Sequence, residues 1–227
     1  MKNNTVLAMV CFLISMSLTA CGDKTSAGNG SSATASLDIK GTSGNAVNMN
    51  GTWTVPCEHS TADNLDILRR NVISGSSVIY IESQWIASTT ANCTQNTTPS
   101  ALFKVTTTAS TGAAAAASWT DGGSSTLPPT GISKTAKATL VTQTFKSVTV
   151  TPGTSQVAVY YNSIALCGKT DYAAGVEKEV FPCAAIGGVS STATSYVVVD
   201  DAAAVLKSYS GEYTTPYLVD STNPMSK

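Results

Sequence analysis

The residues best suited to acid–base or nucleophilic chemistry in this sequence are one histidine and a few carboxylates. His59 stands between Glu58 and Ser60. A catalytic histidine needs a nucleophile and an orienting carboxylate within hydrogen-bond reach, and adjacent residues on a loop seldom align in that way. We therefore expect His59 to be a solvated loop residue and the protein not to be an enzyme; a hydrolase is the least favoured alternative.

Two groups of carboxylates could in principle bind a cation. Glu177 and Glu179 would share one face if residues 176–181 form a strand, but Lys178 between them favours an ordinary solvated surface. Asp200-Asp201 is predicted to form a turn rather than a calcium site. We expect no metal and no cofactor.

Cys21 closes an apolar N-terminal segment that follows a short, positively charged start. The apolar run Val6–Leu18 is shorter than the roughly 20 residues that span a membrane. Leu18-Thr19-Ala20-Cys21 resembles the lipobox of bacterial lipoproteins, in which the thiol is diacylated and the chain is cut before the cysteine. The resemblance implies a signal peptide at residues 1–20, a lipidated Cys21 and attachment to a membrane by acyl chains of the palmitate type. An ordinary cleaved signal peptide is the alternative.

The residue after the lipobox is Gly22 rather than aspartate. By resemblance to the enterobacterial sorting rule, this glycine implies the outer membrane, on its periplasmic or surface face. Only 12% of the residues are charged and the formal net charge is −1. Because nothing in this composition supplies a basic patch that would neutralise phosphates, we exclude nucleic acid as a partner.

Six cysteines are present, and processing would remove Cys11 and lipidate Cys21. An even number of cysteines in an oxidising compartment predicts disulfides, and four cysteines leave three pairings open. We expect Cys57–Cys93 and Cys167–Cys183, because each closes a local loop. A zinc site is the alternative, but the sequence has no C-x-x-C spacing and a single histidine.

The chain divides by composition into three parts. After the signal peptide, residues 21–48 are rich in Gly, Ser, Thr, Ala and Asn and predict a flexible tether. Residues 49–227 are long enough for one domain with a substantial core.

The domain carries a mainly β pattern with frequent turn signals. Runs at 67–73 and 78–86 predict a hairpin, and in the second run Tyr80, Glu82 and Gln84 share one face. Further strands are predicted at 51–55, 102–108, 137–150, 195–199 and 203–209, with a weak strand and a long loop at 112–129. Cap residues at 153–155 and apolar spacing up to Ile164 predict one short helix that stops before Gly168, with a strand as the alternative.

Two short motifs resemble those of lipocalins: Gly51-Thr52-Trp53 matches the G-x-W of the first strand, and Thr170-Asp171-Tyr172 matches a later T-D-Y. The wider pattern, with Cys57, Cys93 and the stretch from Cys167 to Tyr172, resembles small Gram-negative lipoproteins of unknown function. The resemblance implies a single antiparallel lipocalin-like β-barrel; a β-sandwich is the alternative. Trp53, Trp85 and Tyr172 are then candidates to plug the barrel or contact a ligand, although core packing is the favoured interpretation.

These observations predict a lipid-anchored, non-enzymatic envelope lipoprotein. Its barrel would bind a small apolar or amphipathic ligand or serve a structural role. The alternative is a module that binds another envelope protein or acts in adhesion through its Ser/Thr-rich loops.

Overall fold

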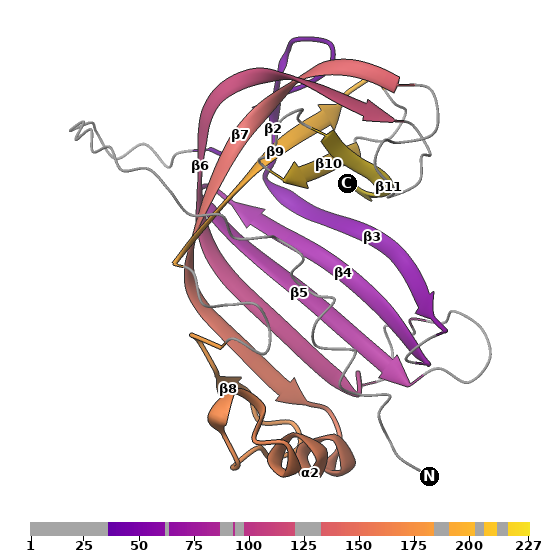
Figure 1. Cartoon of the computed structure of the whole chain (residues 1–227), viewed down its shortest axis with the longest axis vertical. Coiled ribbons are helices and arrows are strands. Elements are labelled where there is room, and N and C mark those ends of the chain that lie inside the picture. Colours follow the sequence, from indigo (N-terminus) through magenta and orange to yellow (C-terminus); the bar gives the residue numbers. More distant parts are fainter. Residues whose placement is uncertain are drawn as a thin grey trace.

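The structure, a computed structural model, describes residues 36–61, 64–86, 93, 98–120, 133–183, 191–202, 207–212 and 218–227. The fold is mainly β, with antiparallel sheets and, within the described residues, one short α-helix (Figure 1). The predicted signal peptide, Cys21 and residues 121–129 of the predicted 112–129 segment lie outside the described residues.

A small sheet of β1 and β2 accompanies one large sheet of nine strands. The strands are β1 Asp38–Lys40, β2 Ala46–Asn48, β3 Gly51–Ser60, β4 Leu65–Ser74, β5 Ser77–Ile86, β6 Ala101–Thr120, β7 Ser133–Pro152, β8 Lys178–Glu179, β9 Thr192–Asp200, β10 Lys207–Glu212 and β11 Leu218–Ser226.

The predicted hairpin is confirmed as β4 and β5, which pair along their whole length. Ser74 lies opposite Ser77, so the turn consists of Gly75 and Ser76 alone. Gly75 has φ 58°, a conformation that two-residue hairpin turns use and that glycine adopts at little cost. This turn fixes the register of every cross-strand pair in the hairpin.

Strands β6 and β7 are 20 residues each, longer than predicted, and the alanine-rich segment forms part of β6. Their pairing shifts register between Thr106 and Thr107 and again between Thr111 and Ala114. Such irregularities bend a strand pair. At the second one, a Cβ on Gly112 would lie 3.2 Å from Leu140, so a small residue lets the bent strands approach.

Neighbouring strands pair in the order β3–β4–β5–β6–β7–β9–β10–β11, but the sheet does not close into the barrel that we expected first. β11 meets β3 at one residue pair, Ser226 with Thr54. Its other end pairs in parallel with β6 at Ser118 and Trp119. The upper halves of β6 and β7 arch over toward β10 and β11 (Figure 1). The bends in β6 and β7 fold the sheet over on itself, so the sandwich alternative fits.

The predicted helix is confirmed as α2, Ser155–Ser163, and the strand alternative is wrong. The Thr154 hydroxyl accepts a hydrogen bond from the Val157 backbone N–H at 3.3 Å and caps the first turn. A short 3₁₀ turn, Leu166–Gly168, follows. The helix packs Ala158 and Tyr161 against the inner face of the sheet, at the end opposite to β9–β11 (Figure 1).

The predicted tether ends earlier than Asn48, because residues from Leu37 onward belong to the folded domain. Leu37 and Ile39 are buried in one cluster with Met49, Trp53 and Val199, and β1 pairs with β2. Leu37 and Ile39 are two residues apart, the spacing that places two apolar side chains on one face of a short strand. Within the described part of the chain, no helix has the length and apolar character needed to cross a bilayer.

Candidate functional site

A network of polar side chains lies on the inner face of the sheet, the face that α2 covers at one end. Its centre is Glu82 on β5, whose side chain is 0% exposed. The hairpin register places Arg69 on β4 directly opposite. A buried carboxylate requires a charged partner or several donors to offset its lost hydration.

Glu82 receives three donors in the network. Arg69 Nε donates to Glu82 Oε2 at 3.0 Å, and the Tyr80 hydroxyl donates to the same oxygen at 2.9 Å. Gln84 Nε2 donates to Glu82 Oε1 at 2.5 Å. Charge-assisted bonds of this kind are stronger than neutral ones. They tie the side chains of β4 and β5 into one unit.

Glu58 on β3 extends the network to a third strand and toward solvent. It forms an ion pair with Arg69 Nη1. Glu58 lies opposite Ile67 in the β3–β4 pairing, and the register shift before it lets its side chain reach Arg69. Its side chain is 29% exposed, so the network has one accessible carboxylate and one sealed carboxylate.

Burial and the charges of the network change the pKa values of two tyrosine side chains. Burial raises the pKa of Tyr80 far above its usual range, and the charge of Glu82 raises it further, more than Arg69 lowers it. Burial also raises the pKa of Tyr161 on α2, with smaller contributions from Tyr172, Tyr160 and Glu82. Both phenols are therefore neutral hydrogen-bond donors at physiological pH.

Part of the network and its neighbours form a half-buried region of the inner face between two apolar clusters. We call this region the inner zone, and its side chains are Glu58, Arg69, Asn71, Tyr80, Val105 and Phe145. On one side lies the helix-covered cluster, with Phe103, Val150 and Tyr161. On the other lies the cluster around Trp53. The inner zone thus combines charge, amide, aromatic and aliphatic groups that keep some solvent contact.

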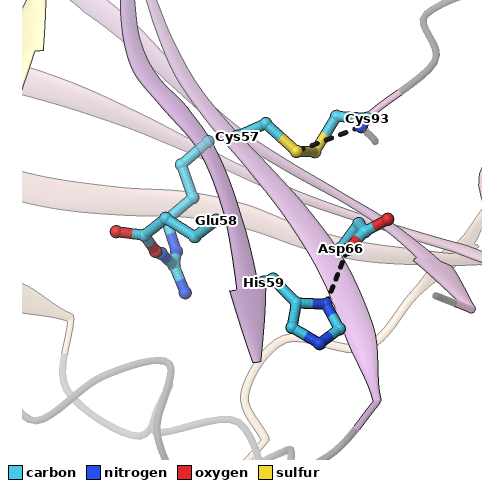
Figure 2. The surroundings of a disulfide bond; sticks show 6 residues. Cys57, Glu58, His59, Asp66 and Cys93 are labelled. Carbon is cyan, nitrogen blue, oxygen red and sulfur yellow. Dashed lines mark hydrogen bonds and ion pairs between the residues drawn. A yellow bond between two sulfur atoms is a disulfide. The ribbon is translucent and has the colours of Figure 1, made fainter. Parts of the chain in front are cut away.

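His59 is not the solvated loop residue that we expected. It lies on β3, half-buried, and its Nδ1 is 2.9 Å from Oδ1 of the buried Asp66 on β4. The pairing places these two residues directly opposite each other, which spacing along the chain did not reveal. Glu58 and His59 point to opposite sides of β3 (Figure 2). His59 and Asp66 provide a base and an orienting carboxylate, which are two of the three roles in a hydrolytic triad.

The structure contains both expected disulfides, Cys57–Cys93 and Cys167–Cys183. The first joins β3 to Cys93 beside the His59–Asp66 pair (Figure 2). The second joins the 3₁₀ turn after α2 to the segment after β8. Both bonds therefore brace the half of the domain that carries the polar network.

The three aromatic candidates are buried and do not meet at one site. Trp53 is 1% exposed, and its indole N–H donates to the Met49 carbonyl at 2.7 Å. Lys227 Nζ lies 5.8 Å from the centre of the Trp53 ring. Trp85 alternates with Gln84 along β5 and so lies on the opposite face from the network.

Tyr172 belongs to the helix-covered cluster. Its hydroxyl donates to the Leu166 carbonyl at 2.9 Å, and its ring contacts Tyr161 edge-on at 5.5 Å. Burial, with a smaller contribution from the charge of Asp171, raises the pKa of Tyr172 to about 12. Its described contacts place it in the core next to α2.

The carboxylates that were considered for cation binding lie at the surface of the fold in contact with other protein groups. Glu177 pairs with Lys104 at 2.6 Å, and Glu179 accepts the Val148 and Phe181 backbone N–H groups at 3.0 Å each. Residues 178–179 form β8, so the strand is shorter than the 176–181 segment considered for it. Asp200 ends β9, and Asp201 accepts the Ser43 backbone N–H at 2.8 Å. Among the described residues, no group of His, Cys, Asp and Glu is arranged to hold a metal ion.

Sequence reasoning missed the Arg69–Glu82 pair, although the signal was present. It placed Tyr80, Glu82 and Gln84 on one face of β5 but named no residue opposite them on the neighbouring strand. Once the turn is restricted to two residues, the register alone places Arg69 opposite Glu82. Comparison with known proteins adds nothing to this assignment, since neither the protein-family models nor the curated proteins give a match to the chain.

Proposed function

We propose that this protein is a lipid-anchored, non-enzymatic lipoprotein of a Gram-negative cell envelope, whose folded domain binds a small amphipathic ligand at the inner zone. The observation that carries the proposal is the Glu58–Arg69–Glu82 network, half open to solvent and bordered by apolar clusters on both sides.

The envelope location is supported by two independent features. The lipobox-like sequence ending at Cys21 fits lipid attachment, and Gly22 after it fits the outer membrane. The disulfides fit an extracytoplasmic compartment, because thiols in the cytosol are kept reduced. An acylated cysteine would hold the domain at the membrane, since each buried CH₂ contributes about 0.8 kcal/mol.

Ligand binding is supported by the kind of side chains that face inward. Sites for small molecules combine apolar walls with a few polar groups that fix orientation. In the inner zone Val105 and Phe145 provide apolar surface, while Asn71 and Arg69 provide donors. A core built only for stability gains little from two carboxylates and one guanidinium, because burying charges costs free energy.

One experiment tests both parts of the proposal. The full chain and its Cys21→Ser variant are expressed with export intact, and the envelope is fractionated. The wild type is expected in the outer-membrane fraction and Cys21→Ser in the soluble periplasm, with Cys11→Ser behaving as wild type. Unchanged fractionation of Cys21→Ser would reject lipid attachment.

The released Cys21→Ser protein is then weighed by native mass spectrometry without prior unfolding. We expect a population heavier than the polypeptide by the mass of a small molecule, lost on denaturation. Arg69→Met, which disrupts the network, should reduce that population, whereas Val159→Ala on the exposed face of α2 should not. A bare polypeptide mass in repeated preparations would count against ligand binding.

A further inference from the structure

Charge is unevenly balanced in the network at the inner zone. Two carboxylates, Glu58 and Glu82, share one guanidinium, that of Arg69. Glu82 is sealed and has three donors, so its requirements are met inside the protein. Glu58 is 29% exposed, and among the described residues its ion-pair partner is Arg69. The accessible end of the network is therefore a carboxylate with room for another donor.

One buried acceptor of the network also lacks a donor among the described residues. Gln84 is 1% exposed, and its amide N–H is used by Glu82. Its Oε1 is buried and has no hydrogen-bond partner among the residues that the structure describes. A buried acceptor without a donor is costly, and native proteins usually satisfy it with a water molecule or a ligand group. This second observation, made on a neutral side chain, also indicates a missing donor.

At Tyr80, the negative charge of Glu82 has a larger effect than the positive charge of Arg69. The charge of Glu82 raises the pKa of Tyr80 more than the charge of Arg69 lowers it. Tyr80 is half-buried on the inner face, and Phe145 stacks on Phe181 with ring centres 6.4 Å apart. Aromatic faces attract cations as well as apolar groups.

Two lysine side chains near this part of the sheet are engaged elsewhere. Lys104 pairs with Glu177, and Lys178 pairs with Asp171. Lys104 lies between Phe103 and Val105 on β6, and so on the opposite face from the inner zone. Neither ammonium group is therefore directed to Glu58 in the structure.

From these observations we infer that the ligand of the inner zone carries a cationic group, an ammonium on an apolar body, and that Glu58 is the carboxylate that receives it. This inference rests on the proposed function and specifies the ligand class for the same site. Val105 and the aromatic rings would contact the apolar body, while Glu82 and Arg69 hold the network in place.

The test uses three probes with the same eight-carbon chain and different polar ends: octylammonium, octanoate and octanol. Each is titrated calorimetrically into the full chain carrying Cys21→Ser. We expect saturable one-to-one binding that is tightest for octylammonium. Glu58→Gln should weaken octylammonium binding by about tenfold or more, because it removes the charge-assisted hydrogen bond to the ammonium group. The matched control Glu177→Gln, an exposed acid outside the inner zone, should leave it unchanged.

The other outcomes separate this inference from the proposed function. Tighter binding of octanoate than of octylammonium would overturn the cationic ligand while supporting an amphipathic one. Octylammonium binding that Glu58→Gln leaves intact would overturn the assignment of Glu58. Saturable binding of none of the probes would overturn both proposals. Thermal unfolding of each variant, with Glu58→Asp as a charge-retaining variant, shows whether a loss of binding reflects a loss of fold.

Discussion

The two ends of the inner face are covered by different elements and differ in how much charge they bury. Around Trp53, the β1–β2 hairpin covers an apolar cluster, and its backbone joins the sheet where the Thr42 N–H donates to the Val199 carbonyl at 2.9 Å. Toward α2, the helix and its tyrosines cover a second apolar cluster, but the half-open charged network lies beside it. The hairpin end is sealed by backbone and apolar contacts, whereas the helix end retains charge with partial access to solvent.

This difference separates an end that mainly supplies stability from an end that carries the candidate site. Apolar burial supplies most of the free energy of folding, and a loss of buried volume leaves a cavity that lowers stability. A buried ion pair contributes little net stability, and losing one member is costly. We therefore expect the hairpin end to tolerate no loss of volume and the helix end to be sensitive to loss of charge balance.

The largest expected effect concerns Trp53. Trp53→Ala would leave a cavity beneath the hairpin and lower the free energy of unfolding by about 3–5 kcal/mol. Urea denaturation monitored by circular dichroism measures the loss. Val159→Ala, on the exposed side of α2, should change the free energy of unfolding by less than about 0.5 kcal/mol and serves as the control. A loss below about 1 kcal/mol for Trp53→Ala would mean that the hairpin end is not the closed core that we describe.

The next effect tests the charged end. Arg69→Met should lower the free energy of unfolding by about 3 kcal/mol, because it leaves the sealed Glu82 carboxylate without its cation. The double variant Arg69→Met with Glu82→Met should recover much of that loss, since replacing a whole buried pair by apolar residues is often neutral. Both are measured by the same urea denaturation. If the double variant is as unstable as the single one, the carboxylate is not the source of the cost.

The smallest effect concerns the attachment of the hairpin. Hydrogen bonds from the Ser43 side chain and backbone lower the pKa of Asp201. A carboxyl whose pKa is lower in the folded state stabilises the fold above its usual pKa, and this contribution is lost as the pH falls through the folded-state value. Asp201→Asn should therefore reduce the melting temperature slightly at pH 7 and flatten its decline below about pH 4. Equal slopes for wild type and variant in that acidic range would show that Asp201 does not hold the hairpin.

Much of the fold could be predicted from the sequence, because alternation and turn residues act locally. The β4–β5 hairpin, α2 with its Thr154 cap and the two disulfides are examples. Closure of the sheet could not be predicted, since it depends on where β6 and β7 bend, and several small residues there permit a bend equally well. The Glu82 network was missed because solvent exposure of a polar strand face is a tertiary property. His59 was misplaced for a similar reason, as Asp66 reaches it across strands.

The early start of the folded domain also bears on how far the domain would reach from the proposed lipid anchor. If Cys21 is lipidated as proposed, only Gly22–Ser36 remain to connect the membrane to the first buried residue, Leu37. Fully extended, that segment spans at most about 50 Å, against about 90 Å for a linker reaching Asn48. The greatest distance between the domain and the bilayer is thus roughly half of the distance that a linker ending at Asn48 would allow. On both proposals, the domain would bind its ligand within about that distance of the membrane surface.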